Sequence, residues 1–190
     1  MATPLRRVYQ MKVTLKVVRP PIWRRVLAMS SMRLDEFHSL LQVVMGWSES
    51  HLHQFVFDGK RYGEPDPEFD FELDDPMLNE KEFRIEQLLK KEKDVLVYEY
   101  DFGDGWEHKI LLEKILPFNP EQPLPKCIAG RRHCPPEDVG GPWGYEDFLE
   151  IYQDSSHPEH EEMREWAGDY FEPEAFDILE VNTELGKYVV

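Results

Sequence analysis

Residues 98–110, YEYDFGDGWEHKI, gather side chains that could do chemistry in one short stretch. Its candidate metal ligands are the carboxylates of Asp101, Asp104 and Glu107 and the imidazole of His108. Such oxygen and nitrogen donors bind divalent metal ions. Two further donors, His51 and His53, stand two positions apart on an expected strand and should point the same way. One hypothesis for the function is therefore metal-dependent hydrolysis at this turn.

The same stretch also has a complete structural explanation. Gly103 and Gly105 permit the positive φ angles of a tight turn, and Asp104 between them can bond its own backbone. Residues 102–106 are therefore typical of a turn between two antiparallel strands. On this interpretation the turn needs no metal.

The acidic groups of the preceding strand also need partners. Glu99 and Asp101 share one side of that strand, where an unpaired buried carboxylate would cost several kcal/mol. The basic stretch IWRRVL offers Arg24 and Arg25 in the same sheet. We therefore expect Glu99 or Asp101 to lie near one of these arginines, and this pairing to explain the acids in place of a metal.

A second set of metal ligands surrounds the two cysteines, Cys127 and Cys134, with His133 beside them. Six residues separate the cysteines and no second pair follows, so a structural zinc site would have to borrow His108 or His160. A disulfide and ordinary buried thiols are the other interpretations, and we favour the buried thiols. A cysteine–histidine nucleophile lacks a supporting signature. We expect no resident metal or cofactor, with a divalent metal ion as the alternative.

Four large aromatic residues stand beside glycines or in the proline-rich stretch. They could line a binding cleft between the sheet and that stretch, or they could anchor the core. The four are Trp47, Trp106, Trp143 and Tyr145.

Alternating and helical patterns give the elements that would position these groups. Residues 9–16 alternate strictly, RPP at 19–21 interrupts them, and an extended run resumes at Ile22, which predicts a hairpin. A helix is expected from Leu34 to Met45, capped by Ser30 or Ser31 and stopped by Gly46. The remaining expectations are a hairpin at 51–63 turned by Asp58-Gly59, an acidic loop at 64–80, a short helix at 84–90, paired strands at 94–102 and 106–116, and helices at 145–152, 157–167 and 173–185.

This order predicts an α+β fold, with a mostly antiparallel sheet built from hairpins, one packed helix and C-terminal helices. The length favours a single domain over residues 1–190. Within it, we expect a sheet core at 8–116, a proline-rich structured loop without regular structure at 117–143, and a helical part at 144–190.

Charge is distributed unevenly along the chain. The net charge is −16, which argues against a generic nucleic-acid binder, yet the first 33 residues hold eight basic and no acidic side chains. Residues 144–190 hold fourteen acidic and two basic ones. Either the basic strands pack beside the acidic helices, or a basic face with Arg19, Arg24 and Arg25 stays open for an anionic partner.

Membrane insertion is not indicated. No stretch approaches the roughly 18 consecutive apolar residues of a spanning helix, and the N-terminus lacks the pattern of a signal peptide. We expect a cytoplasmic protein.

Four blocks occur in an order that resembles the Ri-plasmid ORF-3-like family, also described as a passenger protein family of a bacterial insertion element. They are YQMKVTLKVVRPPIWRRVL, MGWSESHLHQFVF, YEYDFGDGWEHKILLEKILP and CIAGRRHCPPEDVGGPWGYEDFLE. The resemblance implies an α+β domain, prokaryotic origin and an association with mobile elements, and it implies no catalytic residue. Relatives often carry cysteine where this chain has Val139, which weakens a metal site in that loop.

Taken together, the sequence favours a non-enzymatic binding or accessory protein that engages another protein or a small ligand. Metal-dependent hydrolysis at Asp101, Asp104 and His108 is the alternative. DNA binding through the basic N-terminal strands is the second alternative.

Overall fold

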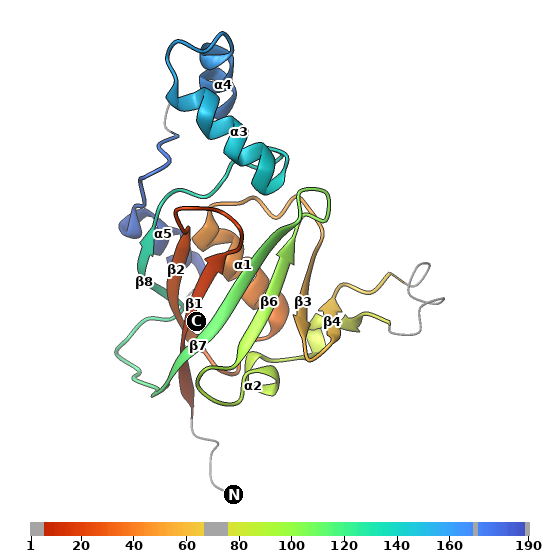
Figure 1. Cartoon of the computed structure of the whole chain (residues 1–190). Helices are drawn as coiled ribbons and strands as arrows, with labels where there is room; N and C mark the ends of the chain where they lie inside the picture. The colour runs from red at the N-terminus through yellow and green to blue at the C-terminus, as the bar shows by residue number, and fades with distance from the viewer. Residues whose placement is uncertain (1–5, 67–75, 169–170, 189–190) are drawn as a thin grey trace, which may run out of the picture.

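A computed structural model describes residues 6–66, 76–168 and 171–188. Its centre is an eight-stranded sheet with the strand order β5-β4-β3-β6-β7-β1-β2-β8 (Figure 1). Neighbouring strands are antiparallel except β4 and β5. The strands are β1 (Arg7–Leu15), β2 (Trp23–Met29), β3 (His53–Phe57), β4 (Lys60–Gly63), β5 (Leu78–Asn79), β6 (Val95–Tyr100), β7 (Trp106–Pro117) and β8 (Lys126–Arg131).

Helices cover one face of this sheet and extend one end of it. The helix α1 packs behind the central strands, α5 lies beside β8, and α3 and α4 form a lobe above the sheet (Figure 1). The helices are α1 (Leu34–Met45), α2 (Ile85–Leu88), α3 (Gly141–Gln153), α4 (His160–Ala167) and α5 (Ile178–Leu185), with 3-10 turns at Glu80–Glu82 and Gly186–Tyr188. The α+β fold expected from the sequence is confirmed.

The main core lies between the sheet and α1. Along β1, Tyr9, Met11, Val13 and Leu15 are buried, whereas Gln10, Lys12 and Thr14 between them are half-buried on the other face. This alternation follows from the two-residue period of a strand. A smaller core on the opposite face joins Val8, Leu27 and Leu124, because the segment after β7 folds over that end of the sheet.

Local sequence patterns predicted several turns, strand pairs and helix ends correctly. Asp58 and Gly59 both have positive φ, as the turn between β3 and β4 requires, and Gly46 ends α1 with φ 87°. The strands on both sides of the 101–105 turn pair as expected.

Other expectations were wrong. The segment 117–143 contains strand β8, which pairs with β2, and α3 already begins at Gly141. Neither Ser30 nor Ser31 caps α1; the side chain of Glu36 instead accepts a bond from the Arg33 amide at the helix start. The last helix begins at Ile178, capped by Asp177, and not near Pro173.

The acidic loop predicted at 64–80 lies partly outside the described residues, and its C-terminal end was predicted wrongly. Residues 67–75 are not described. Leu78–Asn79 forms the strand β5 and Glu80 begins a 3-10 turn.

The expected pairing of Glu99 or Asp101 with Arg24 or Arg25 was also wrong. Strands β7 and β1 separate β6 from β2, so these groups lie on different parts of the sheet. Arg25 pairs instead with Glu113 of β7, and Glu99 accepts a hydrogen bond from Gln54 of β3.

Candidate functional site

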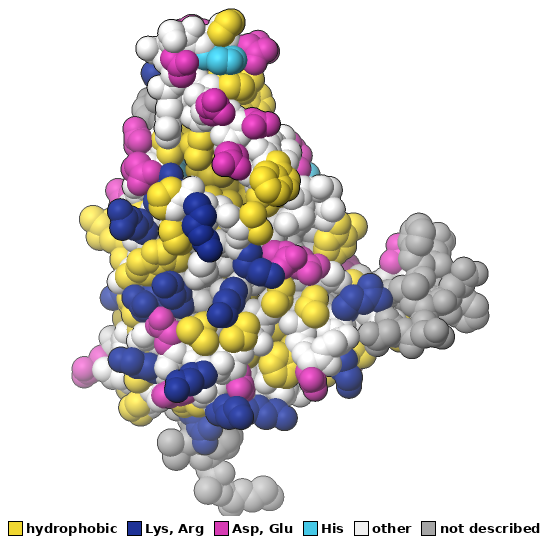
Figure 2. Space-filling view, in the orientation of Figure 1, with side chains coloured by type: hydrophobic (Ala, Val, Ile, Leu, Met, Phe, Trp, Pro, Cys, Tyr) yellow, Lys and Arg dark blue, Asp and Glu magenta, His cyan; other side chains and the backbone are white. Residues whose placement is uncertain are grey.

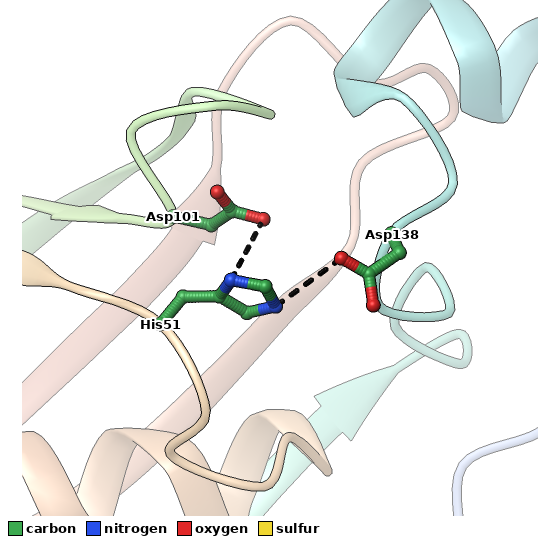
Figure 3. A group of neighbouring side chains, drawn as sticks. All are labelled: His51, Asp101 and Asp138. Carbon is green, nitrogen blue, oxygen red and sulfur yellow. Dashed lines mark ion pairs between the residues drawn. The ribbon is translucent and has the colours of Figure 1, made fainter.

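Three segments far apart in the sequence meet at one end of the sheet, and each contributes an ionisable side chain. His51 precedes β3, Asp101 directly follows β6, and Asp138 lies in the loop before α3 (Figure 3). Nδ1 of His51 is 3.6 Å from an oxygen of Asp101, and Nε2 of the same ring is 3.4 Å from an oxygen of Asp138. The imidazole therefore lies between two carboxylates.

Asp101 has both a structural role and a free oxygen. Its Oδ1 accepts hydrogen bonds from the amides of Gly103 at 2.9 Å and Asp104 at 3.3 Å, so it closes the turn. The sequence pattern had assigned this role to Asp104, and of the two turn glycines Gly105 has a positive φ and Gly103 does not. Its φ of 56° is unusual for a residue with a side chain. The other oxygen, Oδ2, faces His51.

The loop that carries Asp138 is bound to the other two segments beside it. The carboxylate of Glu137 accepts hydrogen bonds from the hydroxyls of Ser48, Ser50 and Tyr100. Burial raises the pKa of Glu137, but these bonds outweigh it and hold the pKa below the usual value. Burial, followed by the bond to Glu137, raises the pKa of Tyr100 to about 12. Glu137 is therefore an ionised acceptor that fastens the loop to the sheet.

A second polar cluster lies next to this junction. His38 of α1 stacks on His53 with ring centroids 3.5 Å apart, and His38 Nδ1 lies 2.7 Å from the hydroxyl of Tyr98. His53 Nε2 lies 2.9 Å from the buried carboxylate of Glu80. Burial, and then the neighbouring His53, lower the pKa of His38 to about 3. His38 is therefore neutral at pH 7.

The side chains of His51 and His53 do not point to one site, contrary to the prediction from their spacing. His51 turns to Asp101 and Asp138, whereas His53 turns to Glu80 and His38. Both histidines line a pocket whose wall also includes Glu49, Phe102 and Glu80. Of the three ionisable groups at the junction, His51 is the one that lines this pocket.

The structure does not bring Asp101, Asp104 and His108 together. His108 pairs with Tyr98 across the hairpin and is fully buried under Trp47, because its position on β7 points to the core. Burial lowers the pKa of His108 to about 4. Asp104 accepts a hydrogen bond from the amide of Gly140 and so helps to hold the loop before α3.

The cysteines are free and buried. Burial raises the pKa of Cys134 to about 12 and also raises the pKa of Cys127. The ring of His133 lies 2.7 Å from the carbonyl of Cys134 and stacks edge-on against Phe171. Within the described ranges, these three residues do not form a cluster of metal ligands.

Three of the four aromatic residues proposed for a cleft belong to the core. Trp47, Trp106 and Tyr145 are buried, and the indole of Trp47 donates to the carbonyl of Pro135 at 3.0 Å. Trp143, in contrast, is 73% exposed on α3. The four therefore do not line one cleft.

The three arginines of the expected basic face also separate. Arg24 is buried on the covered face, Arg25 lies on the open face, and Arg19 is exposed in the loop between β1 and β2. Adjacent strand residues point to opposite faces, so Arg24 and Arg25 could not share one.

Sequence reasoning missed Asp138, Glu137, His38 and Glu80. The sequence PPED was a usable signal for Glu137 and Asp138. Charged residues seldom lie in the core, and loops often carry binding residues, so two carboxylates directly after prolines in a structured loop are candidates for a site. No local pattern indicates His38 or Glu80, which meet their partners only through packing.

Comparisons with known proteins agree with this structure. The family model described as plasmid pRiA4b ORF-3-like protein matches residues 7–180. An uncharacterized protein, y4hQ, of Sinorhizobium fredii is 42% identical over 166 residues, which is 85% of this chain and 81% of that protein. The crystal structure of MM3350, a protein of unknown function from Methanosarcina mazei, superimposes with a TM-score of 0.81 at 36% identity and covers 93% of this chain and 98% of that one. The chain belongs to the plasmid pRiA4b ORF-3-like family.

Proposed function

We propose that this chain is a non-enzymatic accessory protein that binds an acidic partner protein on the open face of its sheet. The observation that carries the proposal is a row of basic and aromatic side chains on that face. The family description, which names a plasmid reading frame, supports an accessory role linked to a mobile element.

The strand register defines this row. Lys109 of β7 is opposite Thr14 of β1, Thr14 is opposite Trp23 of β2, and Trp23 is opposite Arg131 of β8. Directly opposite residues share a face of the sheet. Lys12 stands beside the row, with its ammonium 4.8 Å from the centre of the Trp23 ring.

The cations on this face are only partly neutralised. Arg25 pairs with Glu113, and Lys16 pairs with Glu107. Lys12, Lys109 and Arg131 make no ion pair with any carboxylate of the described residues. Charge is therefore available for a partner.

The acidic part of the chain does not cover this surface. Figure 2 shows lysine and arginine side chains gathered over the sheet, and aspartate and glutamate side chains over the lobe of α3 and α4. The open-face interpretation of the uneven charge is therefore favoured over internal neutralisation.

A protein partner fits better than a nucleic acid. Val97 and Leu111 lie among the cations, and a mixture of apolar and charged groups is common at protein interfaces. A net charge of −16 repels a polyanion as a whole, whereas an acidic patch on a protein meets only the local face. Hydrolysis at Asp101, Asp104 and His108 is not proposed, because His108 is enclosed.

The test measures binding to two fluorescent probes, a peptide of alternating glutamate and leucine and a 20-nucleotide oligothymidylate. The triple variant Lys12→Ala, Lys109→Ala, Arg131→Ala should weaken peptide binding at least tenfold, and added salt should weaken it in the wild type. The matched control Lys60→Ala, Lys90→Ala, Lys187→Ala removes the same charge from outside the row and should change little.

Two results would overturn the proposal. One is equal peptide binding by the two triple variants. The other is tighter binding of the oligonucleotide than of the peptide, which would promote the nucleic-acid alternative.

A further inference from the structure

The imidazole of His51 has a polar atom without a hydrogen-bond partner. Its Nε2 is enclosed and makes no hydrogen bond, although Asp138 lies only 3.4 Å away. Leaving such an atom unsatisfied costs about 1–3 kcal/mol. A metal ion that accepts the lone pair of this nitrogen would remove the cost of leaving the nitrogen unsatisfied.

We propose that His51, Asp101 and Asp138 bind a divalent metal ion of the zinc type. One nitrogen of the ring and one oxygen from each carboxylate lie within 4.8 Å of one another. Tetrahedral zinc holds nitrogen and oxygen ligands at about 2.0–2.2 Å, which places neighbouring ligand atoms about 3.3–3.6 Å apart. The separation of 3.4 Å between Nε2 of His51 and the oxygen of Asp138 already matches. Oδ2 of Asp101 faces the other ring nitrogen at 3.6 Å, so the side chain of His51 or Asp101 turns to bring both carboxylates to the ion on Nε2.

The segments that carry the ligands are held in place without the metal. Oδ1 of Asp101 is occupied by two backbone amides, which leaves Oδ2 for a cation. The amide of Asp101 donates to the carbonyl of Leu52 at 2.8 Å, directly after His51. Glu137, next to Asp138, is bound to Ser48 and Tyr100. Binding therefore requires little ordering of the chain.

The charge of the junction favours a dication. Asp101 and Asp138 each pair with His51, and neither pairs with a lysine or arginine of the described residues. Glu137 and Asp104 add two more carboxylates nearby, and each is bound to groups that carry no formal charge. A divalent ion would offset this negative charge more fully than the ring can.

The metal would also be accessible. His51 lines the pocket beside α1 and the side chain of Asp138 is 74% exposed, so an ion can reach the cluster from solvent. Three protein ligands leave a coordination position for water or for a bound molecule, as in zinc sites that are not purely structural.

The experiment titrates zinc into metal-stripped protein in competition with a chromophoric chelator. We expect one equivalent to bind, and Asp138→Asn to weaken the affinity at least tenfold. Asp147→Asn, which removes an exposed carboxylate from α3, is the matched control and should leave the affinity unchanged. His51→Gln should weaken binding as Asp138→Asn does.

A second measurement separates loss of the site from loss of the fold. Zinc should raise the melting temperature of the wild type but not that of Asp138→Asn, whose metal-free melting temperature should equal that of the wild type. Absence of stoichiometric binding, or equal affinity in Asp138→Asn and Asp147→Asn, would overturn the proposal. Loss of binding in Cys127→Ser or Cys134→Ser, with Asp138→Asn unaffected, would overturn it in favour of the thiols.

Discussion

The guanidinium of Arg24 donates a 2.7 Å hydrogen bond to the carbonyl of Val44, near the C-terminal end of α1. The same side chain donates to the carbonyls of Trp23 and Arg131 at 3.0 Å, and it stacks 4.2 Å from the ring centre of Phe176. Burial lowers the pKa of Arg24, yet the group keeps its proton because arginine titrates far above neutral pH. One buried cation therefore joins α1, β2, β8 and the C-terminal segment.

Replacing Arg24 should be strongly destabilising. Arg24→Ala removes a donor from each of three carbonyls and opens a cavity, so the free energy of unfolding should fall by about 3–4 kcal/mol. Arg25→Ala is the control, because its pair with Glu113 is partly exposed and should contribute about 1 kcal/mol or less. Urea unfolding of both variants measures the difference, and equal losses would contradict the assigned role.

Gly141→Ala should disturb the contact between the 101–105 turn and α3. A Cβ at Gly141 would lie 2.3 Å from the carbonyl oxygen of Asp104, and the φ of 71° disfavours any side chain. We expect a loss of about 2 kcal/mol or more. Gly105→Ala, with φ 68° but open space, should cost about 1 kcal/mol. Gly186→Ala, with neither problem, should be nearly neutral in thermal unfolding.

Asn182 should matter more than its place on a short helix suggests. Its side chain accepts from the amide of Cys127 at 2.9 Å and donates to the carbonyl of the same residue at 2.8 Å. It thereby satisfies both backbone groups of Cys127 on the edge strand β8. Asn182→Ala should lower the free energy of unfolding by about 1–3 kcal/mol. Thr183→Ala, on the exposed side of α5, should cost less than half as much when the two are compared by chemical denaturation.

Stability should decrease below pH 6.5. Burial lowers the pKa of His38 to about 3 and that of His108 to about 4, so both stay neutral in the folded state while the unfolded chain takes up protons below about 6.5. The unfolded state then binds more protons, and each histidine lowers the free energy of unfolding by up to about 1.4 kcal/mol per pH unit as pH falls toward 4. Denaturant melts from pH 7 to pH 4.5 measure this slope. His108→Gln should make it shallower, and an unchanged slope would show that His108 is not responsible.

The thiols should be inert in the folded protein. Burial raises the pKa of both Cys127 and Cys134, so almost no thiolate is present at pH 8. A chromogenic disulfide reagent should label neither cysteine until denaturant is added, and then both. Reductant should leave the melting temperature unchanged, because the two cysteines are not bonded to each other.

Features that depend on neighbouring residues could be predicted from the sequence. The alternation along β1, the Asp58-Gly59 turn and the end of α1 at Gly46 were all correct, because strand period and positive φ are properties of a few adjacent residues. The backbone role of the 101–105 turn was predicted for the same reason. The aspartate whose side chain bonds the turn amides is Asp101, however, three residues before Asp104.

Tertiary structure decided everything that depends on strand order and on contacts between distant segments. Two strands lie between β6 and β2, so Glu99 does not reach Arg25. Glu99 accepts a hydrogen bond from Gln54, and Arg25 pairs with Glu113. Residues 126–131 form the strand β8 because they pair with β2, although prolines lie on both sides of them in the sequence. Asp138 meets His51 because the loop before α3 is fastened to the 47–52 segment by Glu137 and to the turn by Asp104. Such contacts depend on the packing of the whole chain, which no local pattern of residues encodes.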